Sequence, residues 1–201
     1  MNYLAVDTSN KNLTVIIKKD GREYRYEDAE CGVNHSVELM PCIEKLAKDA
    51  DFDFNSADFI ACVVGAGSFT GIRIGVATVK AMCFAFNKPC LSVTSFDTLA
   101  YNKDGKVLAL IDAKHNGFYA CAYQDKKVVM PPEYISRERV EELIKEYTPV
   151  AFAPIDRLPV QVVSVASGLV LAIEKNLDKV TSDLESLTPL YVRKSQAEEG
   201  R

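Results

Sequence analysis

Closely spaced cysteines, long apolar runs and an excess of basic residues are all missing from this 201-residue sequence. Its six cysteines form no Cys-x-x-Cys pair, which argues against a structural zinc site, and we expect reduced thiols buried as small hydrophobic residues. No stretch reaches the roughly 20 apolar residues of a membrane span, and the N-terminus carries no signal-peptide pattern. The net charge of −4 argues against a strongly basic grip on nucleic acid, so a partner would supply most contacts to any RNA. We therefore expect a cytoplasmic protein with no membrane contact and no metal of its own.

The motifs of several enzyme classes are absent as well. The two histidines, His35 and His115, do not have the His-Glu-x-x-His spacing of a zinc protease, and there is no Gly-x-Ser-x-Gly elbow. We expect His35 to cap or pack near the start of a helix, and His115 to lie in a solvated turn.

A β-β-β-α-β-α order occurs twice along the chain, the second time shortened. In the first half, Asp20-Gly21 between two strand-like runs is a hairpin signal, Asn34 is positioned to cap the first helix, and Pro41 falls inside that helix. The polar, turn-rich stretch after Asn102 is the candidate boundary between subdomains 1–102 and 103–201. The first subdomain is predicted to hold strands at 3–8, 13–18, 23–27, 59–64 and 89–93 and helices at 35–50, 72–86 and 95–100. The second is predicted to hold strands at 107–111, 118–123, 127–130 and 149–153 and helices at 137–147 and 165–176.

A glycine-rich turn joins the fourth predicted strand to the second helix. Its glycines are Gly65, Gly67, Gly71 and Gly75, and Thr70 stands where a dinucleotide fingerprint needs its third glycine. The motif does not end in Gly-Lys-Ser/Thr either, so it is not a P-loop. Backbone N–H groups at a helix start can face an anion, which makes Gly67 a candidate phosphate contact. The alternative is that the glycines allow a tight turn and close packing of helix on sheet.

Two aspartates occupy equivalent places in the two halves. Asp7 ends the first strand of the first half, and Asp112 ends the corresponding strand of the second. Each carboxylate could hold Mg²⁺ or water beside a phosphate. The alternative is an aspartate that accepts backbone hydrogen bonds in a turn.

The first two helices carry more apolar residues than one buried face requires. The second has only Arg73, Thr78 and Lys80 as polar residues between Ile72 and Phe86. This surplus predicts a helix-on-helix association surface, although the helices could instead bury against each other and the C-terminal half. The predicted interface residues are Leu39, Met40, Ile43, Ile72, Val76, Val79, Lys80 and Cys83.

The motifs, taken in order, resemble the TsaB family, also called YeaZ. The segments that carry the resemblance are Asp7-Thr8-Ser9, His35-Ser36, the glycine-rich stretch 65–75, Ile111-Asp112-Ala113 and Pro189-Leu190-Tyr191-Val192-Arg193-Lys194. The resemblance implies an actin-like or Hsp70-like ATPase superfold (ribonuclease H-like) with two β-β-β-α-β-α subdomains, the second reduced.

For function, the resemblance implies a dimerisation subunit of the complex that forms N6-threonylcarbamoyladenosine beside the anticodon in tRNAs reading codons that begin with A. It also implies a catalytic paralogue, TsaD, that carries the ATP and metal, an accessory ATPase, TsaE, and a homodimer when TsaD is absent. The tRNA would be bound through the complex.

Departures from the catalytic paralogue argue against activity in this chain. Where TsaD has a His-x-x-x-His metal pair, this sequence has Ser95 and Leu99, and leucine cannot bind a metal. The nearest stretch to the adenosine motif of the superfold is Ala166-Ser167-Gly168-Leu169. We therefore expect neither catalysis nor a bound cofactor. The alternatives are a small-molecule kinase or ATPase with Asp7 and Asp112 around Mg²⁺, and a metallopeptidase that no residue supports.

Overall fold

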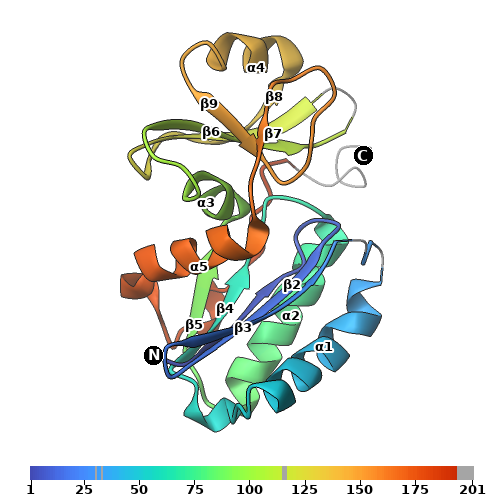
Figure 1. The fold of residues 1–201 in the computed structure, drawn as a ribbon, viewed down its shortest axis with the longest axis vertical. Coiled ribbons are helices and arrows are strands. Elements are labelled where there is room, and N and C mark those ends of the chain that lie inside the picture. Colours follow the sequence, from blue (N-terminus) through green and yellow to red (C-terminus); the bar gives the residue numbers. More distant parts are fainter. Residues whose placement is uncertain (30, 33, 115–116, 194–201) are drawn as a thin grey trace. The chain divides into compact units, whose positions relative to one another are not determined.

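The chain folds as two units, each with its own sheet. The computed structural model describes residues 1–29, 31–32, 34–114 and 117–193 (Figure 1). The first unit comprises residues 1–94 and 173–190, and the second comprises residues 95–172 and the segment from Tyr191. The boundary expected after Asn102 thus falls inside the second unit, because helix α3 (Ser95–Ala100) packs against strands of that unit.

The first sheet has five strands in the order β3-β2-β1-β4-β5. The first three are antiparallel, as predicted, and Asp20 and Gly21 both have positive φ in the turn between β2 and β3. Strands β4 and β5 then run parallel to β1. The strands are β1 (Tyr3–Asp7), β2 (Leu13–Lys19), β3 (Arg22–Asp28), β4 (Phe59–Val63) and β5 (Cys90–Val93).

Helices α1 (His35–Asp49) and α2 (Phe69–Ala85) pack on this sheet, and a single-turn helix η1 (Phe54–Ser56) follows α1. Helix α2 begins earlier than predicted, because the Ser68 side chain caps it by accepting a hydrogen bond from Gly71 N. Asn34 does stand at the N-cap of α1, but its side chain makes no capping hydrogen bond, so that part of the prediction is wrong.

The second sheet repeats the order of the first, as β10-β9-β6-β7-β8. Three antiparallel strands are again followed by two parallel ones, which confirms the actin-like class with a reduced second subdomain. The strands are β6 (Lys106–Asp112), β7 (Gly117–Gln124), β8 (Lys127–Ser136), β9 (Thr148–Ala151) and the two-residue β10 (Gln161–Val162). The other helices are α4 (Arg137–Leu143), shorter than predicted, and α5 (Val165–Lys175), in which the division between the units falls.

Residues 177–190 form a C-terminal strap on the first unit. Thr181 exchanges two backbone hydrogen bonds with Cys90 of β5, Leu187 is buried in the core, and Leu190 N donates to Val64 O. The strap also holds the single turns η2 (Leu177–Lys179) and η3 (Leu184–Ser186). It therefore completes the β5 edge of the first sheet with residues distant in sequence.

All six cysteines are free and buried, as predicted. Burial is also the largest cause that raises the pKa of Cys83 and of Cys121 to about 12. None of the helices in the described part of the chain combines the length and apolar character needed to cross a membrane.

Candidate partner-binding helices and the glycine-rich turn

The glycine-rich turn is pressed against the loop that follows β1. A Cβ on Gly67 would lie 2.0 Å from the carbonyl oxygen of Ser9, and Gly67 has a φ of +150°. Ser68 N donates to that same oxygen at 2.7 Å. A Cβ on Gly65, whose φ is +115°, would meet the Leu190 carbonyl oxygen at 2.8 Å. Backbone from two other segments therefore fills the space that side chains would need here.

The next two glycines, Gly71 and Gly75, bring α2 close to Thr8, the residue that follows β1. A Cβ on Gly71 would lie 2.0 Å from Thr8 O, and one on Gly75 would lie 2.4 Å from Thr8 Oγ1. The Thr8 hydroxyl donates to Gly71 O at 2.7 Å. Together with the Ser9 contact, this geometry supports the packing alternative for the glycine-rich motif.

The aspartates of the two halves have different environments. Asp7 is fully buried, and its Oδ1 accepts a hydrogen bond from Ser9 N at 2.7 Å. Burial raises the pKa of Asp7, against the opposing effects of hydrogen bonds from Ser9 and of the nearby His35. Asp112 is exposed, and its Oδ1 accepts a hydrogen bond from Lys114 N at 2.8 Å. Both carboxylates thus make the local turn contact given as the alternative.

The two histidines were expected to be structural. His35 is buried at the start of α1, and its Nε2 lies 3.2 Å from the carbonyl oxygen of Asn12, so it packs against the loop before β2. His115 lies outside the described residues. Among the residues that are described, no group of three or more His, Cys, Asp or Glu side chains could hold a metal ion.

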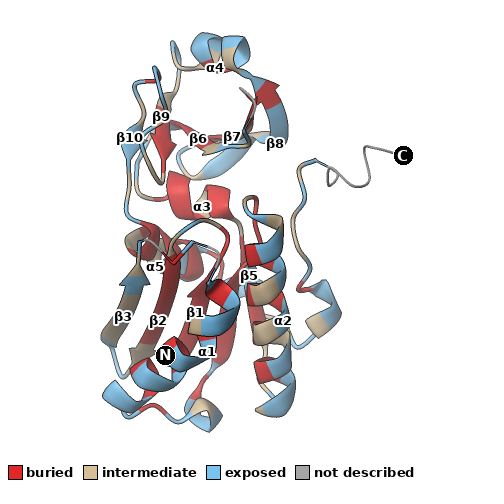
Figure 2. Ribbon diagram, turned by 90° about the vertical axis from the view of Figure 1, so that its right-hand side faces the viewer, coloured by how far each residue is buried: buried red, intermediate tan, exposed pale blue. Residues whose placement is uncertain are grey.

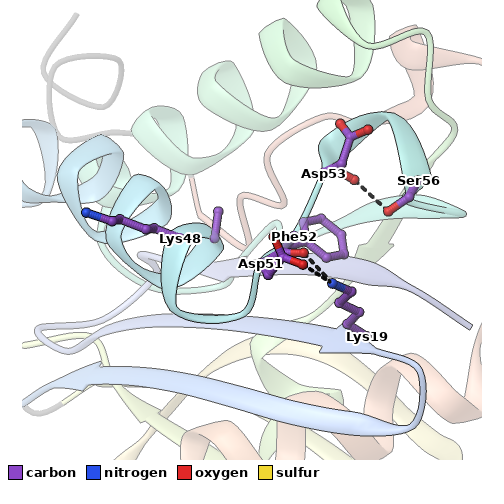
Figure 3. A pocket seen from close by; sticks show the side chains of 7 residues that line it. Lys19, Lys48, Asp51, Phe52, Asp53 and Ser56 are labelled. Carbon is purple, nitrogen blue, oxygen red and sulfur yellow. Dashed lines mark hydrogen bonds and ion pairs between the residues drawn. The ribbon is translucent and has the colours of Figure 1, made fainter.

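A hollow of about 560 Å³ lies beside the C-terminal end of α1 (Figure 3). The Lys19 ammonium group reaches into it and donates to Ala50 O at 3.4 Å, to Asp51 O, and to Asp51 Oδ2 at 3.2 Å. Ser56 Oγ donates to Asp53 O at 2.6 Å. Lys19 thus supplies donors to carbonyl groups that the end of a helix leaves unpaired. The hollow therefore lies at a helix end, and its Lys19 ammonium group already makes hydrogen bonds within the chain.

Most of the predicted interface residues are not at the surface. Six of them belong to the core formed by α1, α2 and one face of the first sheet. The sequence argument was wrong for these six residues. It counted them as surplus apolar residues, but the sheet and the paired helix cover them. The six buried residues are Leu39, Ile43, Ile72, Val76, Val79 and Cys83.

The remaining two predicted residues do reach the surface. Met40 is 43% exposed, and the Lys80 ammonium group lies 4.0 Å from Glu185 of the strap.

Helix α2 nevertheless has exposed residues at regular spacing, and several of them are apolar; Figure 2 shows the exposed parts of the helix in pale blue. We call Arg73, Ala77, Ala81 and Phe84 the α2 stripe; they repeat every three or four residues and share one side of the helix. Phe84 is 82% exposed, an unusual position for a phenylalanine side chain.

The sequence held a signal for Phe84 that was missed. Arg73 marks the solvent side of α2, and counting forward by helical spacing from Arg73 leads to Phe84. On α1, Val37 is 67% exposed and belongs to the same helical side as Met40 and Pro41. The apolar surface of this helix pair is thus real, but it consists of other residues.

Comparison with known proteins identifies the family. Residues 29–199 match the family model described as TsaD, tRNA N6-adenosine threonylcarbamoyltransferase. The tRNA threonylcarbamoyladenosine biosynthesis protein TsaB of Bacillus subtilis is 28% identical over 98% of this chain and 96% of its own length. The chain belongs to the TsaB (YeaZ) family. TsaB of Escherichia coli is 27% identical over 75% of this chain and 71% of its own. The structure of YeaZ from Pseudomonas aeruginosa superposes with a TM-score of 0.79 at 23% identity, covering 94% of this chain and 99% of that one, and shows the same fold.

The positions at which this TsaB-family chain departs from the TsaD pattern are used for packing. Ser95 and Leu99, which the resemblance aligns with the metal pair of TsaD, are buried on α3. A Cβ on Gly168, in the stretch nearest to an adenosine motif, would lie 1.8 Å from Thr98 O. Asn102 Nδ2 donates to that oxygen at 2.7 Å. Gly168 therefore allows α5 to cross α3 closely within the second unit.

Proposed function

We propose that this chain is a non-catalytic scaffold subunit in the formation of N6-threonylcarbamoyladenosine in tRNA, and that it docks α1 and α2 on a TsaD partner. The names of its TsaB relatives support the pathway, and the matching family model supports a partner of related fold. The observation that carries the docking proposal is the α2 stripe with Phe84 at its end.

The stripe suits a helix-on-helix contact. Ala77 and Ala81 have short side chains, so a partner helix can approach the α2 backbone closely, and Phe84 then supplies an aromatic anchor. Burying one phenylalanine side chain contributes about 1.5–3 kcal/mol. Val37 and Met40 on α1 add exposed apolar side chains to the same helix pair. A contact centred on these residues would be apolar, with Arg73 at one end of the stripe.

The same surface supports a second mode of association. A paralogous partner of like fold presents an equivalent helix pair, and so does a second copy of this chain, so the α2 stripe can pair with itself in an isologous dimer. We propose a homodimer in isolation and a heterodimer when TsaD is present. TsaE, the bound ATP, the metal and the tRNA would join through the complex in the cytoplasm.

Two features support the proposal that this chain is not the catalyst: the atoms that contact its glycine-rich turn and the side chain at position 99 of α3. The Ser9 carbonyl oxygen, an acceptor, lies at the place where an anion would need donors. Leu99 stands where the paralogue has a metal-binding histidine, and its side chain cannot ligate a metal.

Co-purification with TsaD tests the docking proposal. Phe84→Glu places a charge in the α2 stripe and should abolish co-elution with TsaD as well as self-association in gel filtration. Val162→Glu is the matched control, since Val162 is 54% exposed on β10 in the other unit. It should co-elute like the parent chain. Charged residues at Val76 or Val79 would instead test folding, because both are buried.

Two outcomes decide the proposal. Loss of the complex with Phe84→Glu alone, while circular dichroism shows a folded chain, supports it. Equal co-elution of both variants would rule out docking through α2.

A further inference from the structure

Polar side chains share one face of the hairpin formed by β1 and β2. Asp7 is directly opposite Thr14 in the antiparallel register, so the two side chains lie on the same face. Asn12 lies in the turn of this hairpin, directly before β2, and its Oδ1 is buried. Asp7 is 0% exposed and Thr14 is 1% exposed. A buried carboxylate and a buried hydroxyl thus share one face at the end of this hairpin, and a buried amide oxygen lies in its turn.

Three buried oxygens of this hairpin have no hydrogen-bond partner within the part of the chain that is described. They are Asp7 Oδ2, Asn12 Oδ1 and Thr14 Oγ1, and we call them the hairpin oxygens. Buried polar atoms normally have partners, because leaving one unpaired carries its full desolvation cost. Carboxylate, amide carbonyl and hydroxyl oxygens are also the donors that hard cations prefer.

The charge of Asp7 is not balanced by a basic side chain. None of the ion pairs among the described residues includes this carboxylate. His35 acts on the pKa of Asp7 as a basic group, but its Nε2 lies 3.2 Å from the Asn12 carbonyl oxygen. A buried carboxylate in this setting calls for a counter-charge.

We propose that the hairpin oxygens bind a monovalent alkali cation, sodium or potassium. One carboxylate among two neutral oxygens supplies a single negative charge, which matches a single positive charge. Mg²⁺ and Ca²⁺ each carry two positive charges, which a single buried carboxylate balances only in part, so a monovalent ion suits the charge of this donor set better.

The cation would act on the start of α2. Asp7 Oδ1 accepts a hydrogen bond from Ser9 N, and the Ser9 carbonyl oxygen accepts one from Ser68 N. These hydrogen bonds link the hairpin turn to the glycine-rich turn. Binding at the hairpin oxygens would stabilise the Asp7 side chain from which this chain of contacts begins.

Thermal unfolding of the full chain tests the site. Melting curves are compared in choline chloride, sodium chloride and potassium chloride at one ionic strength. An alkali cation at about ten times its Kd should raise the melting temperature by about 3–6 °C over choline. Asp7→Asn and Thr14→Val should lose this difference. Asp112→Asn should keep it, because Asp112 is the equivalent but exposed aspartate of the second hairpin.

A crystal grown with thallium(I) or rubidium gives a second measurement that needs no variant. Anomalous density between the hairpin oxygens would support the cation, and would still do so if Asp7→Asn failed to fold. Density for water alone at that place would overturn the proposal. So would equal melting temperatures in choline and alkali salts, or a difference that survives in both Asp7→Asn and Thr14→Val.

Discussion

Two glycines of α2 can be distinguished by what each one touches. Gly71→Ala would place its methyl group 2.0 Å from Thr8 O, a backbone atom, whereas Gly75→Ala would place its methyl group 2.4 Å from Thr8 Oγ1, a side-chain atom. Helix propensity alone favours alanine over glycine by about 1 kcal/mol at each position. Any loss of stability must therefore come from the contact with Thr8.

The expected magnitudes differ because a side chain can move and a backbone cannot. Overpacking costs about 1–3 kcal/mol, and the upper end applies to Gly71→Ala, which leaves a net loss of about 2 kcal/mol after the gain in propensity. In Gly75→Ala the Thr8 hydroxyl must rotate away and lose its hydrogen bond to Gly71 O. One such bond contributes about 1 kcal/mol and residual crowding costs about 1 kcal/mol more, so the net loss after the gain in propensity is about 1 kcal/mol.

Thr8→Ala separates the two cases. It removes the hydroxyl that meets the alanine at position 75 but leaves the backbone oxygen that meets the one at position 71. In the Thr8→Ala background, Gly75→Ala should become neutral or stabilising by up to about 1 kcal/mol. The penalty of Gly71→Ala should stay within about 0.5 kcal/mol of its value in the parent chain.

Urea unfolding of the parent chain, the three single variants and the two double variants gives these free energies, with the m-value as a check on the transition. The reasoning fails if Gly71→Ala is more stable than the parent. It also fails if Gly75→Ala costs as much with Thr8→Ala as without it, because the hydroxyl would then not be the obstacle.

Three further predictions concern the rest of the molecule. Lys19→Met should lower the free energy of unfolding, measured in urea, by about 0.5–1 kcal/mol, because it removes hydrogen-bond donors from the end of α1. Lys48→Met in the same hollow should have a smaller effect, and equal losses would refute the capping role of Lys19. Stability should fall as pH rises from about 9 toward 12, because burial raises the pKa of Cys83 and Cys121 from 9.0 to about 12 and the unfolded chain releases these protons first; a flat profile in alkaline thermal melts would contradict it. Calorimetry with ATP and Mg²⁺ on the isolated chain should show no binding heat, and micromolar binding with turnover would favour a kinase or ATPase instead.

Much of the fold could be predicted from local pattern. The Asp20-Gly21 turn and the repeat of the element order predicted two sheets of like topology, which the structure has. These features depend on residues close together in sequence. The start of α2 was placed too late, because the prediction did not treat Ser68 as a capping residue.

Features that depend on distant contacts could not be predicted. The C-terminal strap joins the first unit through backbone hydrogen bonds of Thr181 and Leu190. The sequence around these two residues does not indicate that β5 and Val64 are their partners. The docking residues were misjudged for a similar reason. The apolar content of a helix does not say which side the sheet covers, so buried Val76 was taken for surface, and the exposed Phe84 was passed over.

The most direct measurement is the dissociation constant between this chain and TsaD, by titration calorimetry, for the parent chain and for Phe84→Ala. If α2 docks as proposed, truncating the ring removes about 1.5–3 kcal/mol and weakens binding by about 10–150-fold. An unchanged dissociation constant, with heat still released on mixing, would mean that TsaD binds elsewhere on the chain.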